Sequence, residues 1–250
     1  IQKIMQNTPK GTKIWKNKIL GLRGKATGLV FSNFERSRHV RSKEWAKQFV
    51  LKQGEKKKEE FFLFFTAGVD TAYSQKSPDT IAMSFTGITN KGLCVVLAEK
   101  VYNNAELQVP LAPSDTVKNL YEFMERNRKE WGLARNIFLD NADQATMQEW
   151  NKFKRRNACV YVLNNAWKQM EIIDRINTQL GWMSYDDAAG IEPCFAVLDC
   201  CPAYIGELET YSWNEEKDNV PEDGHDHMVN SVQYGFIPYQ SKIFRRKGEE

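Results

Sequence analysis

A run of large apolar residues that ends in a single acid places the strongest constraint on how this chain can fold. Residues 60–72 read EFFLFFTAGVDTA, in which five large apolar side chains precede a step of small residues and then Asp70. A continuous apolar run of this length is typical of a β-strand buried on both faces of a sheet. We therefore expect Asp70 to lie where a central strand leaves the core.

A second segment repeats the pattern of an apolar strand that ends in an acid. Residues 136–140 read NIFLD and end in Asp140. If the two strands were neighbours, Asp70 and Asp140 would lie together, and paired carboxylates suit a divalent metal ion. A turn or a helix cap explains a single acid of this kind equally well, so only the pair indicates a functional site.

The remaining periodicity predicts a mixed α/β fold. Three strand-like runs separated by turn signals, 61–69, 80–88 and 92–102, predict an antiparallel meander. After residue 113 helical periods alternate with strands, so we expect a mixed sheet with helices on its faces. The expected later strands are 136–140, 159–163 and 195–198, and the expected helices are 114–131, about 142–156, one that carries Ile173, Ile176 and Leu180, one near 202–213 and one near 226–236.

Charge separates the start of the chain from the rest. Residues 1–58 hold 16 Lys/Arg against 3 acids, whereas the remainder holds 19 against 29, within a net charge of +3. A basic flank beside an acidic body suits a polyanionic substrate or an acidic neighbouring domain. A solvated linker is the alternative, and for the lysine run 56–58 alone it is the better explanation.

Breaker residues also set this flank apart. Glycine and proline interrupt residues 1–59 repeatedly, which predicts a linker with one or two hairpins, followed by a domain over 60–240 and a charged tail over 241–250. The chain opens with Ile rather than Met, so we expect a piece of a longer polypeptide.

Composition and cysteine usage indicate the class of protein. The chain is 42% hydrophobic and 27% charged, as expected of a soluble globular protein, and it shows no signal peptide or membrane-spanning stretch. Its five cysteines are odd in number and lack C-x-x-C spacing, which predicts reduced core thiols in a cytosol-like compartment.

A third polar cluster lies near the end of the chain. Residues 222–234 read EDGHDHMVNSVQY and hold two of the three histidines beside several acids. If Asp226 caps a helix, His227 and Asn230 lie one turn apart on the same face, where both could serve one ion. A histidine beside an acid is usually a structural pair. Only the combination of this cluster with Asp70 and Asp140 indicates a metal site.

Several short motifs, taken together, resemble one protein family. In order and spacing they are similar to the C-terminal nuclease domain of bacteriophage large terminase subunits, the ATP-driven motors that package viral DNA. The motifs are NTPKG at 7–11, GLVFSNF at 28–34, AGVDTA at 67–72, IFLDNA at 137–142, VLNNAWK at 162–168 and DHMVNSVQY at 226–234. The last is similar to the family's closing D-H-x-x-D-A-x-x-Y pattern, except that Asn230 stands in place of an acid.

The resemblance implies a ribonuclease H-like fold and a metal-dependent endonuclease that cuts concatemeric viral double-stranded DNA. Two divalent ions, Mg²⁺ or Mn²⁺, would assist phosphodiester hydrolysis. We expect Asp70 to bridge both ions and Asp140 to hold one. His227 and Asn230 would hold the other ion, and an imidazole ligand favours Mn²⁺.

Other residues are weaker candidates. Because Asn230 carries no charge, either Asp226 or Asp223 completes the site with His227, or metal binding is weakened. Asp143 follows Asp140 by one helical step. Lys168 would face the scissile phosphate, although a solvated lysine is an equal possibility, and the DNA would also contact Lys56, Lys57 and Lys58.

The resemblance also implies partners and rival functions. The partners would be double-stranded DNA, an ATPase domain of the same polypeptide, the small terminase subunit and the portal, with no membrane, in a viral packaging complex in the host cytoplasm. One rival is another ribonuclease H-like enzyme, such as a resolvase or transposase. The other is a non-catalytic DNA-clamping or docking module in which Asn230 marks a lost metal site.

Overall fold

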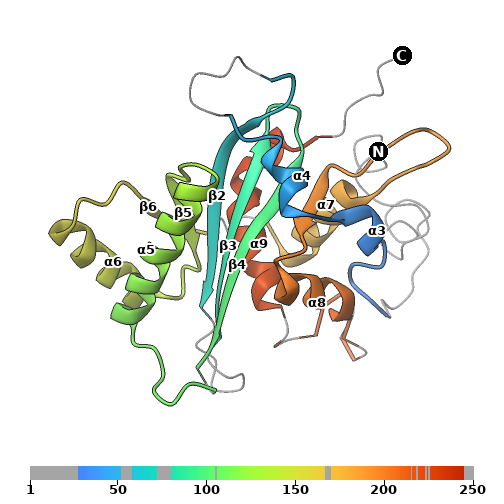
Figure 1. Cartoon of the computed structure of the whole chain (residues 1–250). Coiled ribbons are helices and arrows are strands. Elements are labelled where there is room, and N and C mark those ends of the chain that lie inside the picture. The colour runs from blue at the N-terminus through green and yellow to red at the C-terminus, as the bar shows by residue number, and fades with distance from the viewer. Residues whose placement is uncertain are drawn as a thin grey trace.

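A seven-stranded mixed sheet forms the centre of the molecule (Figure 1). The computed structural model describes residues 28–51, 58–71, 80–104, 106–166, 170–214, 216–217, 219–222, 224 and 226–244. The strand order is β1-β7-β4-β3-β2-β5-β6. The strands are β1 (Val40–Arg41), β2 (Phe62–Thr71), β3 (Thr80–Thr89), β4 (Cys94–Asn103), β5 (Asn136–Leu139), β6 (Val162–Asn165) and β7 (Phe195–Leu198).

The pairing of the strands confirms the expected fold class. β2, β3 and β4 form the antiparallel meander, while β5 and β6 extend it in parallel from β2, and β7 and β1 extend it in parallel from β4. Among these strands β3 alone runs against the others. This is the ribonuclease H-like mixed sheet that the sequence predicts.

Helices cover both faces of the sheet, which explains why its central strands are largely buried and rich in apolar residues. α5 and α6 lie on one side, and α7, α8 and α9 lie on the other (Figure 1). Every residue of β3 is buried between these layers. The helices are α3 (Arg36–His39), α4 (Lys43–Lys47), α5 (Pro113–Glu130), α6 (Gln144–Arg156), α7 (Ile172–Met183), α8 (Pro202–Thr210), α9 (His227–Phe236) and a 3₁₀ turn, η1 (Ile237–Lys242).

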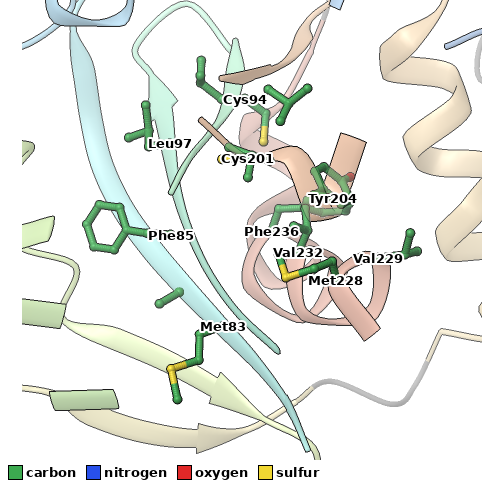
Figure 2. Packing of buried hydrophobic residues seen from close by; sticks show 14 of the residues in the cluster. Met83, Phe85, Cys94, Leu97, Cys201, Tyr204, Met228, Val229, Val232 and Phe236 are labelled. Atoms are coloured by element: carbon green, nitrogen blue, oxygen red, sulfur yellow. The ribbon is translucent and has the colours of Figure 1, made fainter. Parts of the chain in front are cut away.

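The core lies on both sides of the central strands. Figure 2 shows Met83 and Phe85 of β3 on one side, and Tyr204 of α8 with Val232 and Phe236 of α9 on the other. All five side chains are almost completely buried. Since residues of a strand point alternately to its two faces, β3 contributes to both halves of this core.

The described part of residues 1–59 differs from the expected linker with hairpins. It contains α3, β1 and α4, and β1 pairs in parallel with β7 at the edge of the sheet. Val30, Phe31 and Phe49 are buried in the same core as the sheet, because they cover apolar surface that would otherwise face water. The division of the polypeptide at residue 59 stays a prediction.

One expected strand is displaced along the chain. The sequence predicts a strand at 159–163, but β6 begins at Val162. The parallel ladder starts where its partner β5 starts, with Asn136 opposite Val162, so the preceding apolar residues only lead to the sheet. The other expected helices and strands lie within a few residues of the observed bounds.

Most of the cysteines are core residues, as the sequence predicts. All five cysteines are free, and Cys94, Cys194 and Cys201 are buried, whereas Cys200 is exposed. In the part of the chain that the structure describes, no helix combines the length and the apolar character needed to cross a membrane.

Candidate active site at the end of strand β2

Asp70 and Asp140 leave the sheet side by side. β2 and β5 are parallel neighbours with Val69 opposite Leu139, so the two acids follow at adjacent positions. The backbone N–H of Asp140 donates to the Val69 carbonyl over 3.3 Å, which holds the end of β5 against β2. Asp70 still lies within β2 and is only 6% exposed.

Helix α9 packs directly on β2 because glycine lets the two backbones touch. A Cβ atom at position 68 would lie 1.8 Å from the Ser231 carbonyl oxygen, so only glycine fits there. The Ser231 hydroxyl donates to the Gly68 carbonyl over 2.9 Å. One turn further along α9, the Thr66 hydroxyl donates to the Gly235 carbonyl over 2.9 Å.

This packing register brings His227 to Asp70. The helix runs antiparallel to the strand, so a step of four helix residues, about 6 Å, matches a step of two strand residues, about 6.6 Å. Gly235 therefore lies on Thr66 and Ser231 on Gly68, and the next step places His227 beside Asp70. The observed distance from His227 Nδ1 to Asp70 Oδ2 is 3.2 Å.

Burial and neighbouring charges alter both members of this pair. Burial raises the pKa of Asp70; its hydrogen bond and charge contact with His227 oppose that rise, and the charges of Asp226 and Asp140 add to it. For His227, burial acts to lower the pKa, but the hydrogen bond and charge of Asp70, with the charges of Asp226 and Glu207, raise it overall. Negative charge is therefore crowded at this edge of the sheet.

Tyrosine hydroxyls hold the two flanking acids. Tyr234 donates to Asp140 Oδ2 over 2.9 Å, while the backbone N–H of Ala142 donates to the other oxygen of Asp140 over 2.8 Å. Tyr211 donates to Asp226 Oδ2 over 3.1 Å. Each acid is thus oriented by a neutral donor that leaves its charge in place.

Asn230 bonds to Asp226. Its amide nitrogen donates to Asp226 Oδ2 over 3.0 Å, across one turn of α9. Asp226 is 8% exposed and lies at the start of the helix. That His227 and Asn230 serve the same ion stays a prediction.

Asp143 has a structural task. It is the N-cap of α6, where its Oδ1 accepts from the backbone N–H of Thr146 over 2.9 Å. Its other carboxylate oxygen is buried and has no hydrogen-bond partner among the described residues. Asp143 therefore serves first as a helix cap.

Of the predicted DNA-contacting lysines, the structure describes Lys58, and the DNA contacts of all four stay predictions. Lys58 donates to the carbonyls of Gln48 and Val50, each over 3.2 Å, and so ties the segment after α4 to the start of β2. Lys56, Lys57, Lys168 and the alternative acid Asp223 lie outside the described residues.

The residues suit a divalent cation by their chemistry, although they do not form a closed cage. Asp70, Asp140 and Asp226 offer hard oxygen atoms, and His227 Nε2 is buried with no partner among the described residues. A histidine whose Nδ1 is held by a carboxylate commonly presents Nε2 to a metal. Within the described residues, however, no three His, Cys, Asp or Glu side chains converge closely enough to hold one ion.

Three residues beside the site, Glu207, Tyr211 and Arg175, carry no signal in the sequence. Glu207 accepts from the backbone N–H groups of Met228 and Val229 over 3.0 and 2.8 Å, and so fixes the start of α9. Burial raises the pKa of Glu207 to about 8, against the effect of those two donors. No local motif marks these residues, whereas Tyr234 closes the pattern at 226–234.

Comparisons with known proteins reveal a likeness of fold. No protein-family profile and no characterised protein sequence matches the chain. The large terminase of a thermophilic bacteriophage is similar in one crystal form with a TM-score of 0.68 and 16% identity over 94% of this chain. The same terminase in complex with ATP-γ-S gives a TM-score of 0.67, also at 16% identity, over 93% of this chain.

That large terminase is the longer protein. The chain spans 50% of its length in both structures. The large terminase nuclease from a second thermophilic phage, G20c, with bound cobalt, aligns at a TM-score of 0.47 and 14% identity.

Proposed function

We propose that the chain is a metal-dependent DNA endonuclease of a viral DNA-packaging motor. The observation that carries this proposal is the meeting of Asp70 and His227, 3.2 Å apart, with Asp140 and Asp226 beside them, on a ribonuclease H-like sheet. Carboxylates that lie close together repel one another, which lowers the stability of the fold. A histidine nitrogen beside them has no partner among the described residues, so the group favours cation binding.

The cations would be Mg²⁺ or Mn²⁺, most simply two ions. When bound, they would supply activation of water and stabilisation of negative charge on the phosphate and the leaving oxygen. Asp70, Asp140 and His227 would hold them, with Asp226 in place of the acid that position 230 lacks. Tyr234 and Tyr211 would keep the carboxylates of Asp140 and Asp226 in orientation through their hydroxyls.

A terminase relationship supports DNA as the substrate. The fold matches a phage large terminase over nearly the whole chain, and that terminase is solved with nucleotides bound. We infer that an ATPase domain of the same polypeptide is a partner, and that duplex viral DNA is cut during packaging in the host cytoplasm. The small terminase subunit and the portal would be further partners. Residues 1–59 would form the linker, or the end of the ATPase domain, that precedes the nuclease domain.

A docking module is the second candidate. In its favour, the described residues lack a three-ligand cage, and the side chain of Asn230 is bound to Asp226. In that case the acids would only shape a surface, and the chain would grip DNA without cutting it.

Plasmid nicking separates the two functions. Supercoiled plasmid is incubated with the wild-type chain in Mg²⁺, in Mn²⁺ and in EDTA, beside Asp70→Ala and Asp199→Ala. Asp199 is the matched control, because it also follows an apolar strand, β7, but is exposed and three strands away from β2. We expect cation-dependent nicking by the wild type and by Asp199→Ala, and none by Asp70→Ala. Binding of the plasmid without nicking under every condition would favour the docking module.

A further inference from the structure

Arg175, in the first half of α7, is half-buried, and two of its three guanidinium nitrogens have no hydrogen bond with any described residue. These two nitrogens, Nε and Nη1, are inaccessible to solvent. An arginine is always charged and offers five N–H donors in a fixed plane. Because unpaired buried donors are costly, such a group calls for an anion that completes it.

The position of Arg175 connects it to the active site. Its Cζ lies 5.6 Å from the centre of the Tyr234 ring, and the Tyr234 hydroxyl donates to Asp140. Its charge also acts on Tyr211, which donates to Asp226. Arg175 is therefore adjacent to both tyrosines that orient the site acids, while its Nε and Nη1 bond to neither acid.

The geometry suits one class of ligand. The planar fork of a guanidinium matches two oxygens of a phosphate, and stacking on an aromatic ring fixes the plane of the fork. The acids of the site repel a polyanion, so a positive group at the same edge is needed where the DNA backbone enters. Arg175, which lies beside the Tyr234 ring and has two nitrogens without a partner among the described residues, meets that need.

We propose that Arg175 binds a backbone phosphate of the DNA in the active site, and that its half-buried side chain turns so that Nε and Nη1 reach the phosphate. This inference rests on the proposed function, since it takes DNA to be the substrate. The opposing explanation is structural: Arg175 would only offset the repulsion among Asp70, Asp140 and Asp226. The two explanations differ in whether its removal changes DNA binding or only stability.

The test measures binding of a short duplex DNA by fluorescence anisotropy in Ca²⁺, over a series of salt concentrations. The variants are Arg175→Gln, which removes the charge, and Arg175→Lys, which keeps it without the planar fork. The matched control is Arg126→Gln, because Arg126 on α5 also lies over an aromatic ring, Phe123, at 5.7 Å but is exposed and carries no proposed role. Melting temperatures are measured on every variant.

Arg175→Gln should weaken binding by about tenfold and reduce the slope of log affinity against log salt by about 1, as expected when one phosphate contact is lost. Arg175→Lys should keep the slope and lose part of the affinity, and Arg126→Gln should bind as the wild type does. If Arg175→Gln does not fold, the Arg175→Lys variant is used alone. A lower affinity for DNA at an unchanged melting temperature would then support the proposal. Unchanged affinity and slope in the variants, with a lower melting temperature, would overturn the proposal.

Plasmid nicking by the same proteins separates this inference from the proposed function. Nicking by the wild type together with undiminished DNA binding by Arg175→Gln would refute the role of Arg175 alone. A wild type that binds DNA through Arg175 but never nicks would refute the nuclease alone. A wild type that neither binds duplex DNA nor cuts it would overturn both.

Discussion

Two regions of the molecule hold their acids in different ways. Beside α8 and the start of α9, two half-buried glutamates each accept two backbone N–H groups. Glu99 on β4 accepts from Ala203 and Tyr204 over 2.7 and 2.8 Å, and Glu207 accepts from Met228 and Val229. The N-cap residues of α8 and α9 make no side-chain cap bond, so these glutamates replace the missing caps.

At the ends of β2 and β5 the acids instead face one another. Asp70, Asp140 and Asp226 interact as like charges, and hydroxyl or imidazole partners orient them. The comparison teaches that burial of an acid is not by itself a sign of function. A carboxylate with two backbone donors is complete, whereas carboxylates that crowd together are completed by a cation.

The largest expected effect is on cleavage. Asp140→Ala should reduce cation-dependent nicking by roughly a thousandfold, because losing a ligand removes several kcal/mol of transition-state stabilisation. Glu99→Ala should nick at close to the wild-type rate but lose about 1–2 kcal/mol of stability as α8 loses its cap. The nicking rate and the free energy of unfolding, from chemical denaturation, are measured for both variants. Loss of nicking by Glu99→Ala with normal nicking by Asp140→Ala would contradict the distinction between the two regions.

The next effect is on packing, and two glycines test it. Gly68→Ala should cost about 3 kcal/mol or more and lower the melting temperature strongly, because the new Cβ collides with the Ser231 carbonyl. Gly206→Ala on α8 is the control, since a Cβ there meets nothing within 4 Å. It should stabilise by about 0.5–1 kcal/mol, as alanine favours the helix more than glycine does. Equal melting temperatures for the two variants would contradict the close packing of α9 on β2.

A smaller effect concerns cation affinity. His227→Ala should weaken Mn²⁺ binding by roughly 10- to 100-fold in calorimetric titration, as expected when a ligand or its supporting partner is lost. Asn230→Asp should strengthen binding, because an anion replaces a neutral amide beside Asp226. No gain for Asn230→Asp together with a severe loss for His227→Ala would make histidine the principal third ligand.

The smallest effect is on stability without a cation. The pKa of Asp70 is raised, so the folded chain loses stability as pH rises above the usual aspartate range. Protonated His227 compensates at low pH; its pKa is also raised, so that compensation is lost as pH rises through the folded value, above 6.5.

Asp70→Asn removes the charge and keeps an acceptor for His227. In EDTA at pH 8 it should be more stable than the wild type by about 1 kcal/mol, a shift of about 2–4 °C, with a smaller gain at pH 6. Thermal melts at both pH values measure the difference. A gain that grows towards low pH would contradict the assigned direction of the shifts.

Much of the fold follows from local patterns. The apolar runs that form most of β2 and all of β7 predict buried strands, because burial on both faces leaves no polar alternation. The adjacency of β2 and β5, which brings Asp70 and Asp140 together, was a hypothesis from two similar apolar runs, and it depends on a strand pairing between distant parts of the chain. The packing of residues 30–50 could not be predicted, since it depends on an edge of β7 that only the folded sheet presents.

The site was less accessible to sequence reasoning. Asp70, Asp140 and His227 are distinguishable because each stands out locally, at the end of an apolar run or in a dense polar cluster. Arg175, Glu207 and Tyr211 are single polar residues on helices or at helix ends, and only their three-dimensional neighbours give them a task. The hydrogen bond from Asn230 to Asp226 was not predicted, because helical spacing places both Asp226 and His227 one turn from Asn230 and does not choose between them.

The contact between α9 and β2 fixes where His227 lies along the strand. A Cβ atom at position 68 would lie 1.8 Å from the Ser231 carbonyl oxygen, so the two backbones touch, and their register sets the distance from His227 to Asp70. A register shifted by one turn would place Ser231 opposite Asp70 and remove the imidazole from it. A side chain added at position 68 would therefore disturb the pair of His227 and Asp70 although it contacts neither residue directly.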